Sequence, residues 1–251
     1  MNRSAWRPTV IRTGATYPDF SGLVAGMNLG HEQEAPILCL ALEQGSTRIL
    51  VDTGLPELDW VTSNFGKGTK TADEVLERAL EIGPGWRPGD VDFVINTHLH
   101  FDHCGGNRTF PNARFVVQRR EYDFARRPGL GVEALYPAHL FDERAVDWFD
   151  WLFVDGDHEL LPGLRLLFTP GHSVGHQSVV FDATDGVTVY AGDAVCRMES
   201  FEQRLAPGLY TDLGAALESI ERIRAVARRI IPSHDTRIAN GQTRDFPEVT
   251  R

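Results

Sequence analysis

The sequence has few cysteines and no excess of positive charge, and each shortage argues against a class of protein. Cysteine occurs only 3 times in 251 residues, at scattered positions. We therefore expect no disulfide framework, and a reducing cytoplasm is the expected location. The 25 basic residues are outnumbered by 35 acidic ones, which gives a net charge of −10. Nucleic-acid-binding proteins usually have a basic surface, so we expect no nucleic-acid partner.

Long apolar runs are also missing. No stretch approaches the roughly 18 apolar residues of a membrane-spanning helix, so we expect no membrane partner. The first residues, MNRSAWRPTVIRTG, lack the apolar core of a secretory signal. Hydrophobic residues make up 42% of the chain, which is enough for a sizeable core. Because no repeat or change in composition marks a linker, we predict a single domain over residues 1–251.

Short apolar runs predict strands at 37–42, 49–51, 91–98, 113–118, 164–171, 177–183, 187–194 and 229–235. A helix is predicted over 71–82, where Thr71 and Glu74 fit a capping box. Residues 120–150 are expected to be mainly helical. A last helix is predicted over 211–229, with one apolar face formed by Leu213, Leu217, Ile220, Ile223 and Val226. The pattern indicates layered sheets with helices outside and a site built from loops at one edge.

One segment, THLHFDHCGGN at 97–107, concentrates side chains that bind metals. The four are His98, His100, Asp102 and His103. His98 and His100 are two residues apart, so in an extended segment they point the same way. Gly105 and Gly106 are expected to let the backbone turn and approach whatever is bound. An apolar strand delivers these groups to a poorly hydrated edge, where a cation would compensate them.

Further ligand-type residues follow later apolar strands. His172 comes after Pro170 and Gly171, Asp193 after the apolar run VTVYAG, and His234 after the apolar residues of the last predicted strand. Taken singly, Asp193 fits a turn or a helix cap, and His234 a packed core histidine. Taken together, they favour completion of a metal site. His176 is better suited to a hydrogen bond that supports the loop.

The H-x-H-x-D-H string, followed by His, Asp and His in this order, resembles the metallo-β-lactamase superfamily. The likeness covers about residues 35–237 and includes VDTG at 51–54. It implies an α/β fold, a four-layer αββα sandwich in which two mixed β-sheets are flanked by helices. Within the superfamily, HLHFDHCGGN, TPGHSVGHQS and the dipeptide at 201–202 are most similar to N-acyl-homoserine lactonases and to lactonases such as pyridoxolactonase.

The resemblance implies a centre of two zinc ions. His98, His100 and His172 would hold one ion, Asp102, His103 and His234 the other, and Asp193 would bridge them. Iron, cobalt or manganese can occupy the same kind of ligand set. Cys104 and Cys196 are expected to pack or to line the pocket, because the ligand set is complete without them.

The resemblance further implies a hydrolase that opens a lactone ring by attack of a metal-bridging hydroxide on the carbonyl. Asp102 would carry a proton towards the leaving oxygen. The homoserine lactonases have a tyrosine three residues after the bridging aspartate, whereas this sequence has Cys196, a weaker donor. An alternative substrate is therefore another ester, a cyclic amide or a thioester. A purely structural metal site is a further alternative.

The substrate pocket is expected to be lined by two insertions, around 55–70 and 120–153. Trp60 and Phe65 in the first are predicted substrate contacts, together with Cys196. Their aromatic character favours a small-molecule lactone or ester with an apolar portion. The expected assembly is a monomer or a homodimer.

Overall fold

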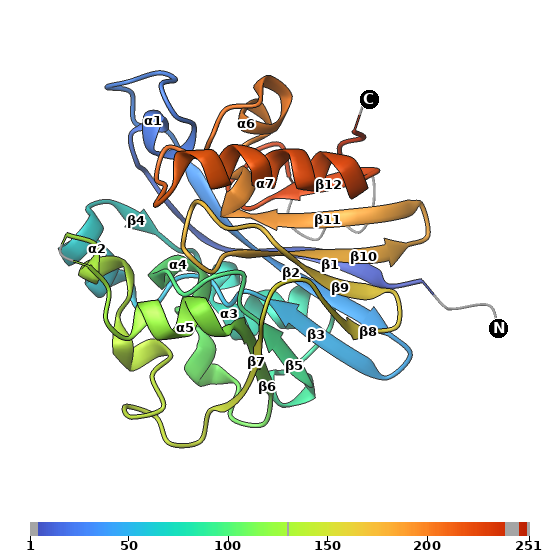
Figure 1. The fold of residues 1–251 in the computed structure, drawn as a ribbon. Helices are drawn as coiled ribbons and strands as arrows, with labels where there is room; N and C mark the ends of the chain where they lie inside the picture. Colours follow the sequence, from blue (N-terminus) through green and yellow to red (C-terminus); the bar gives the residue numbers. More distant parts are fainter. Residues whose placement is uncertain (1–4, 130, 239–245, 250–251) are drawn as a thin grey trace.

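This computed structural model describes residues 5–129, 131–238 and 246–249. Within these ranges two β-sheets stack face to face (Figure 1). The 7-stranded sheet has the order β4-β1-β2-β3-β5-β6-β7, with β1 Arg7–Thr16, β2 Ala35–Gln44, β3 Thr47–Val51, β4 Gly68–Thr69, β5 Phe93–Ile95, β6 Arg114–Gln118 and β7 Asp150–Val154. The 5-stranded sheet has the order β12-β11-β10-β9-β8, with β8 His158–Leu161, β9 Leu164–Phe168, β10 Gln177–Ala183, β11 Gly186–Gly192 and β12 Arg229–Pro232.

Both sheets are mixed, as predicted. The neighbours β3, β5, β6 and β7 run parallel, and so do β11 and β12. The pairs of β2 with β1 and β3, and of β10 with β9 and β11, are antiparallel. The carboxyl ends of parallel strands meet at one edge of a sheet, and residues that follow these strands are therefore brought together.

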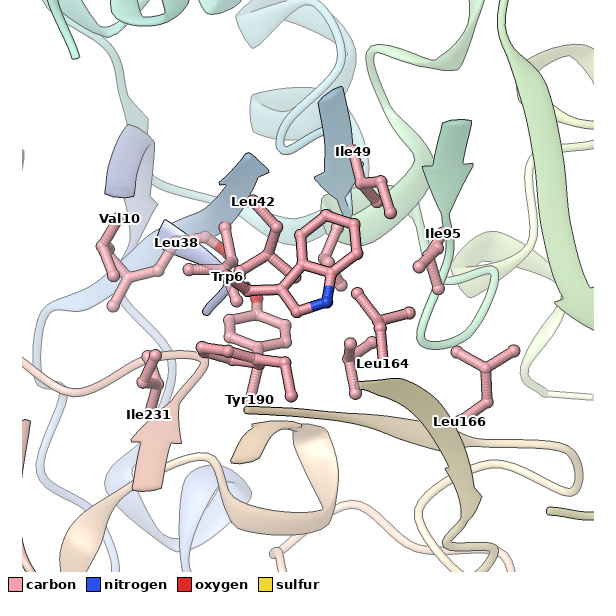
Figure 2. Close-up of a cluster of buried hydrophobic side chains, with 14 of the residues drawn as sticks. Trp6, Val10, Leu38, Leu42, Ile49, Ile95, Leu164, Leu166, Tyr190 and Ile231 are labelled. Atoms are coloured by element: carbon pink, nitrogen blue, oxygen red, sulfur yellow. Dashed lines mark hydrogen bonds between the residues drawn. The ribbon is translucent and has the colours of Figure 1, made fainter. Parts of the chain in front are cut away.

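The central core lies between the sheets (Figure 2). Strand β2 shows why its sequence is apolar throughout. Leu38, Leu40 and Leu42 join the cluster between the sheets, whereas Cys39 and Ala41 join the cluster on the outer face. Since successive side chains of a strand point to opposite faces, β2 is buried on both sides.

Helices cover the two outer faces and complete the predicted αββα layers. Helix α3 (Leu76–Ile82) packs on the first sheet, and α7 (Leu213–Val226) packs on the second. The remaining α-helices are α1 (Phe20–Leu23), α2 (Leu58–Phe65), α4 (Phe101–Cys104), α5 (Arg119–Ala125) and α6 (Met198–Gln203). None of the helices in the described ranges is long and apolar enough to cross a bilayer.

The helix predicted over 71–82 is divided in two. Thr71 and Glu74 do form the predicted capping box, but it caps a short 3-10 turn, Ala72–Glu74. Val75 has an extended backbone, and the α-helix begins after it. Glu74 also pairs with Arg12 of β1 at 2.6 Å, which attaches the short turn to the sheet.

The prediction of a mainly helical segment over 120–150 was wrong. Helix α5 ends at Ala125, and among the described residues of this segment only two 3-10 turns follow, Glu133–Leu135 and Ala138–Leu140. Pro128 and Pro137 explain the difference, because proline lacks the N–H that a helix interior needs. Aromatic side chains from this segment and from β7 instead pack against the outer face of the first sheet.

The last helix is shorter than predicted and rotated. Asp212 caps its start by accepting a hydrogen bond from the backbone N–H of Ala215. Ile220 and Ile223 are buried as expected, whereas Leu213 and Leu217 are exposed. The buried stripe is completed by the small residues Ala216 and Ser219. The loop at Gly171 lies directly against the helix backbone at Ala216. A side chain does not fit at position 171, because a Cβ there would lie 2.2 Å from the nitrogen of Ala216.

Candidate metal centre

The structure brings together all seven predicted ligand residues at one end of the sandwich. Each follows a strand: His98, His100, Asp102 and His103 follow β5, His172 follows β9, Asp193 follows β11 and His234 follows β12. Asp102 is partly exposed, and the other six are buried. Residues from both sheets therefore meet in one poorly hydrated place, as the sequence predicted.

The first cluster consists of three histidine nitrogens. His172 Nε2 lies 3.2 Å from His98 Nε2 and 3.0 Å from His100 Nδ1. Burial and the neighbouring histidines lower the pKa of His98 well below its usual value, and burial does the same for His100. Both imidazoles are therefore neutral, which is the form that binds a metal.

The second cluster consists of Asp102, His103 and His234. The Oδ2 atom of Asp102 lies 3.8 Å from the Nε2 atoms of both His103 and His234. The potential ligand atoms of these three residues all lie within 4.8 Å of one another. Imidazole nitrogen with carboxylate oxygen is a donor set that suits zinc and related divalent cations.

Asp193 lies between the two clusters and gives one oxygen to each. Its Oδ1 is 3.1 Å from His103 Nε2 and 3.0 Å from His234 Nε2, while Oδ2 is 3.3 Å from His172 Nε2. Burial alone would raise the pKa of Asp193, but the facing His234 and His103 hold it well below its ordinary value. The ionised carboxylate thus has the placement of a bridging ligand.

The donor set fits a bound cation. His103 Nε2 is buried and has no hydrogen-bond partner. The Nδ1 atom of the same ring donates to Asp52 Oδ2 at 2.7 Å, and Nε2 faces Asp193 and the second cluster. Burial alone would lower the pKa of His103, but Asp193, Asp52 and Asp102 raise it well above its ordinary value, so this place stabilises a positive charge. A bound cation would supply that charge in place of the proton.

Asp52 supports the second cluster through its hydrogen bond to the ring of His103. Besides His103, its carboxylate accepts hydrogen bonds from the backbone N–H of Thr97 at 2.7 Å and from its hydroxyl at 2.8 Å. Asp52 is fully buried and has a left-handed backbone with φ 59°. Such a conformation costs about 1–3 kcal/mol in a residue other than glycine, and it is typically found at functional sites.

The outer nitrogens of two other ligands are held by the main chain. His172 Nδ1 donates to the carbonyl of Leu209 at 2.8 Å, and His234 Nδ1 donates to the carbonyl of Pro36 at 3.0 Å. Each bond directs the remaining ring nitrogen into the centre. His176 instead uses both nitrogens in hydrogen bonds, to the Thr169 hydroxyl and from the Asp193 backbone N–H. The predicted supporting role of His176 is confirmed.

Comparison with known proteins identifies the family. The sequence profile described as the metallo-beta-lactamase superfamily matches residues 34–234. The chain belongs to this superfamily. Its relatives include an N-acyl homoserine lactonase of Bacillus cereus, 32% identical over 95% of this chain and 96% of that protein. The N-acyl homoserine lactonase AttM of Rhizobium radiobacter is 31% identical over 64% of this chain and 61% of its own length.

Solved structures in the superfamily agree with this relationship. A structure of an N-acyl homoserine lactone hydrolase, with the product N-hexanoyl-L-homoserine bound at the catalytic metal center, superposes with a TM-score of 0.80. It is 29% identical and covers 93% of this chain and 95% of its own. The crystal structure of a quorum-quenching N-acyl homoserine lactone lactonase also has a TM-score of 0.80, at 31% identity, with 94% of this chain and 95% of that chain covered. The metallo-beta-lactamase fold expected from the motif is thus confirmed.

In this superfamily member, two of the predicted substrate contacts form an aromatic group with Phe101, the residue between His100 and Asp102. Phe65 stacks on Phe101 at a centroid distance of 4.1 Å, and Trp60 lies 5.6 Å from the same ring. Contact of Trp60 and Phe65 with a substrate stays a prediction.

The third predicted contact, Cys196, lies in an apolar cluster with Phe20, Leu23, Val24 and Ala35. Its thiol donates to the carbonyl of Asp193 at 3.7 Å. Cys104 likewise is buried and donates to the carbonyl of Leu99 at 3.5 Å. All three cysteines of the chain are free thiols. Their placement agrees with the expected packing role of Cys104 and Cys196.

Gly105 and Gly106 lie in close contact with the loop after β3. A Cβ at Gly105 would lie 2.3 Å from both the Gly54 carbonyl oxygen and the Pro56 nitrogen, and one at Gly106 would lie 2.6 Å from the Thr53 carbonyl oxygen. The glycines therefore let α4 pack against this loop, while their expected approach to a bound group stays a prediction. The same loop begins with Asp52, whose contact with His103 the sequence analysis missed.

Proposed function

We propose that this protein is a metal-dependent hydrolase that opens lactone rings. The observation that carries the proposal is the division of the Asp193 carboxylate, with one oxygen facing His172 and the other facing His103 and His234. The N-acyl homoserine lactonases that match nearly the whole chain support it. In this proposal His98, His100 and His172 hold one Zn²⁺, Asp102, His103 and His234 hold the second, and Asp193 bridges them.

Divalent cations bound here would supply Lewis acidity and lower the pKa of a bound water. Asp102 is the ligand best placed to move a proton. Its side chain is 15% exposed, more than those of His103, Asp193 and His234. Its Oδ2 faces the histidines, while within the described residues Oδ1 makes no hydrogen bond or ion pair. We propose that Oδ1 accepts a proton from the water that adds to the carbonyl and passes it to the oxygen that leaves when the ring opens.

The aromatic group formed by Trp60, Phe65 and Phe101 is the proposed binding surface for an apolar part of the substrate. Phe65 is 36% exposed and Phe101 is 6% exposed, so one member of the stacked pair faces solvent and the other is buried. In this proposal an acyl chain lies on Phe65, which stacks on Phe101, and the reacting carbonyl lies at the metal ligands. This arrangement favours lactones that carry a hydrophobic substituent.

Another ester, a cyclic amide or a thioester is the second candidate substrate class. Cys196 favours it, because this thiol is occupied with the Asp193 carbonyl and is a weak donor. Zinc as the native metal, and a monomeric or homodimeric assembly, are parts of the same proposal.

The test is acid release from a panel of acyl-homoserine lactones, simple lactones, esters and thioesters, followed in weakly buffered solution. We expect hydrolysis of at least one lactone, its loss after chelation, and recovery on addition of Zn²⁺, Co²⁺ or Mn²⁺. Elemental analysis should find two ions per chain. Hydrolysis that survives complete metal removal would refute the proposal, as would a fully metallated protein inactive on every lactone.

A further inference from the structure

A buried carboxylate outside the ligand set lies behind the first cluster. Glu121 belongs to α5 and is fully buried. No lysine or arginine among the described residues forms an ion pair with it, and burial raises its pKa. A buried carboxylate without a cationic partner costs free energy of folding. We therefore expect its hydrogen bonds to fix groups that matter for the site.

The hydrogen bonds of Glu121 join two separate segments that carry ligands. Oε1 accepts from the backbone N–H of Leu99 at 3.1 Å. Oε2 accepts from the Ser173 hydroxyl at 2.8 Å and from the Gly175 backbone N–H at 2.9 Å. Leu99 lies between His98 and His100, and Ser173 follows His172. A single carboxylate thus connects the two segments that supply all three histidines of the first cluster.

The packing around Glu121 leaves little room for these segments to move. A Cβ at Gly175 would lie 2.3 Å from the Glu121 nitrogen, so the His172 loop rests directly on the backbone of α5. On the other side, the ring of Tyr136 meets the ring of His100 edge-on at 4.7 Å. Both loops are therefore held against the helix that carries the carboxylate.

We propose that Glu121 is a positioning residue that sets the spacing between the His98–His100 segment and the His172 loop, and so controls metal binding at the three-histidine cluster alone. Glu121 contacts no ligand side chain of the second cluster; its hydrogen bonds go to Leu99, Ser173 and Gly175. The inference rests on the metal centre of the proposed function, but it requires no knowledge of the substrate.

Glu121→Gln tests it with little change of shape. The amide keeps one acceptor oxygen, but its NH₂ group would face a donor, either the Leu99 N–H or the Ser173 and Gly175 pair, so one of the two connections is lost. Metal-free protein is titrated with Co²⁺ and followed by calorimetry and visible absorption. We expect one of the two ions to bind about 10- to 100-fold more weakly than in the wild type, and the other to bind unchanged.

The same substitution in a His234→Ala background identifies the weakened site. His234→Ala breaks the second cluster and should leave one Co²⁺ equivalent, at the three histidines. Adding Glu121→Gln should weaken that remaining ion by the same factor. Asp123→Asn is the matched control, since it removes an exposed carboxylate from the same helix and should change neither ion.

Equal weakening of both ions, or no weakening, would overturn the inference, because a general loss of structure does not select one cluster. If Glu121→Gln does not fold, Ser173→Ala takes its place: it removes one donor to Oε2 and should weaken the same ion by a smaller factor. A wild-type protein that binds no Co²⁺ would instead refute the proposed function. Normal binding of two ions with an unaffected Glu121→Gln variant would refute only the role of Glu121.

Discussion

One buried carboxylate lies behind each histidine cluster, and the two contact the protein differently. Asp52, at the end of β3, accepts a hydrogen bond from the ring of His103, a ligand-type side chain of the second cluster. Glu121, on α5, accepts its hydrogen bonds from main-chain N–H groups and the Ser173 hydroxyl around the first cluster, and the side chain of Tyr136 lies next to it. Burial raises the pKa of both carboxyls, but only in Asp52 does a histidine oppose that rise strongly.

This difference separates two ways of supporting a ligand. A carboxylate bonded to the imidazole fixes its tautomer and increases its basicity, so Asp52 acts on the donor strength of His103. A carboxylate bonded to the backbone leaves the imidazole unchanged and sets only where it lies. In the second cluster, which already contains the Asp102 carboxylate, the outer carboxylate thus changes the basicity of a ligand. In the all-histidine cluster, the outer carboxylate changes only the positions of the ligands.

The largest effect is expected where the two clusters meet. Asp193→Asn keeps the shape of the bridge but removes its charge and one acceptor oxygen. We expect kcat/KM for a hydrolysed lactone to fall by more than the roughly 100-fold typical of losing an outer partner, with loss of one metal equivalent. Kinetics and elemental analysis measure both. A variant that keeps two ions and full activity would show that the clusters are independent.

Asp52→Asn should affect the cluster that Glu121→Gln leaves intact. The amide is a weaker acceptor for His103, so we expect about 10- to 100-fold weaker binding of the ion at Asp102, His103 and His234 only. Co²⁺ titration of the two variants side by side measures the contrast. If both substitutions weaken the same ion, the proposed division of labour is incorrect.

Phe65→Ala should leave both clusters intact and change only substrate binding. The ring makes a stacked contact with Phe101, and such aromatic contacts contribute about 0.5–1.5 kcal/mol. We expect KM for a long-chain lactone to rise by about 2- to 10-fold, with the metal content unchanged. A lactone without an acyl chain is the control substrate and should show no change. Loss of metal in this variant would show that Phe65 also supports the metal centre and does not act on substrate binding alone.

The smallest effect is expected at Asp142, which attaches the loop after α5 to the helix that carries Glu121. Asp142 is buried, pairs with Arg144 of the same loop and lies 3.6 Å from Arg126, the C-cap residue of α5. Arg144 is largely exposed, so we expect Asp142→Asn to lower the free energy of unfolding by only about 1 kcal/mol at neutral pH.

The difference in the free energy of unfolding between the wild type and Asp142→Asn should depend on pH. Hydrogen bonds from Arg144 hold the pKa of Asp142 below its ordinary value of 3.8. Because the folded-state pKa is lowered, the contribution of Asp142 is complete above 3.8 and is lost as the pH falls below it. Urea unfolding of wild type and variant from pH 7 to pH 3 measures this. A difference that stays constant at low pH would show that the charge of Asp142 is not involved.

The ligand candidates could be predicted from the sequence because each comes within a few residues of the end of an apolar strand. A run such as VTVYAG before Asp193 identifies a buried strand, and the polar residue after it lies at the strand end. The αββα layers and the division of the ligands between two ions came from the resemblance of the H-x-H-x-D-H string to the superfamily. Asp52 carries the same signal after β3, although its contact with His103 depends on a left-handed backbone that no propensity predicts.

Glu121 could not have been found in this way. It lies within the charged run RREYD, where a glutamate normally faces solvent, and only the packing of the His172 loop on α5 buries it. The irregular segment after α5 was missed for a related reason. Its apolar residues are buried by contacts with distant strands, so their spacing follows no helical period.

The ligands come from both sheets, and this has a consequence for how the protein is made. Ribosomal synthesis delivers His98 well before His234, and His234 reaches its place only when β12 aligns beside β11. A nascent chain therefore could not hold the proposed pair of ions, because the second ion would bind only after the last strand has docked. Since a ligand that binds only the finished state stabilises that state by mass action, metal supply in the cell would set how long each new molecule survives.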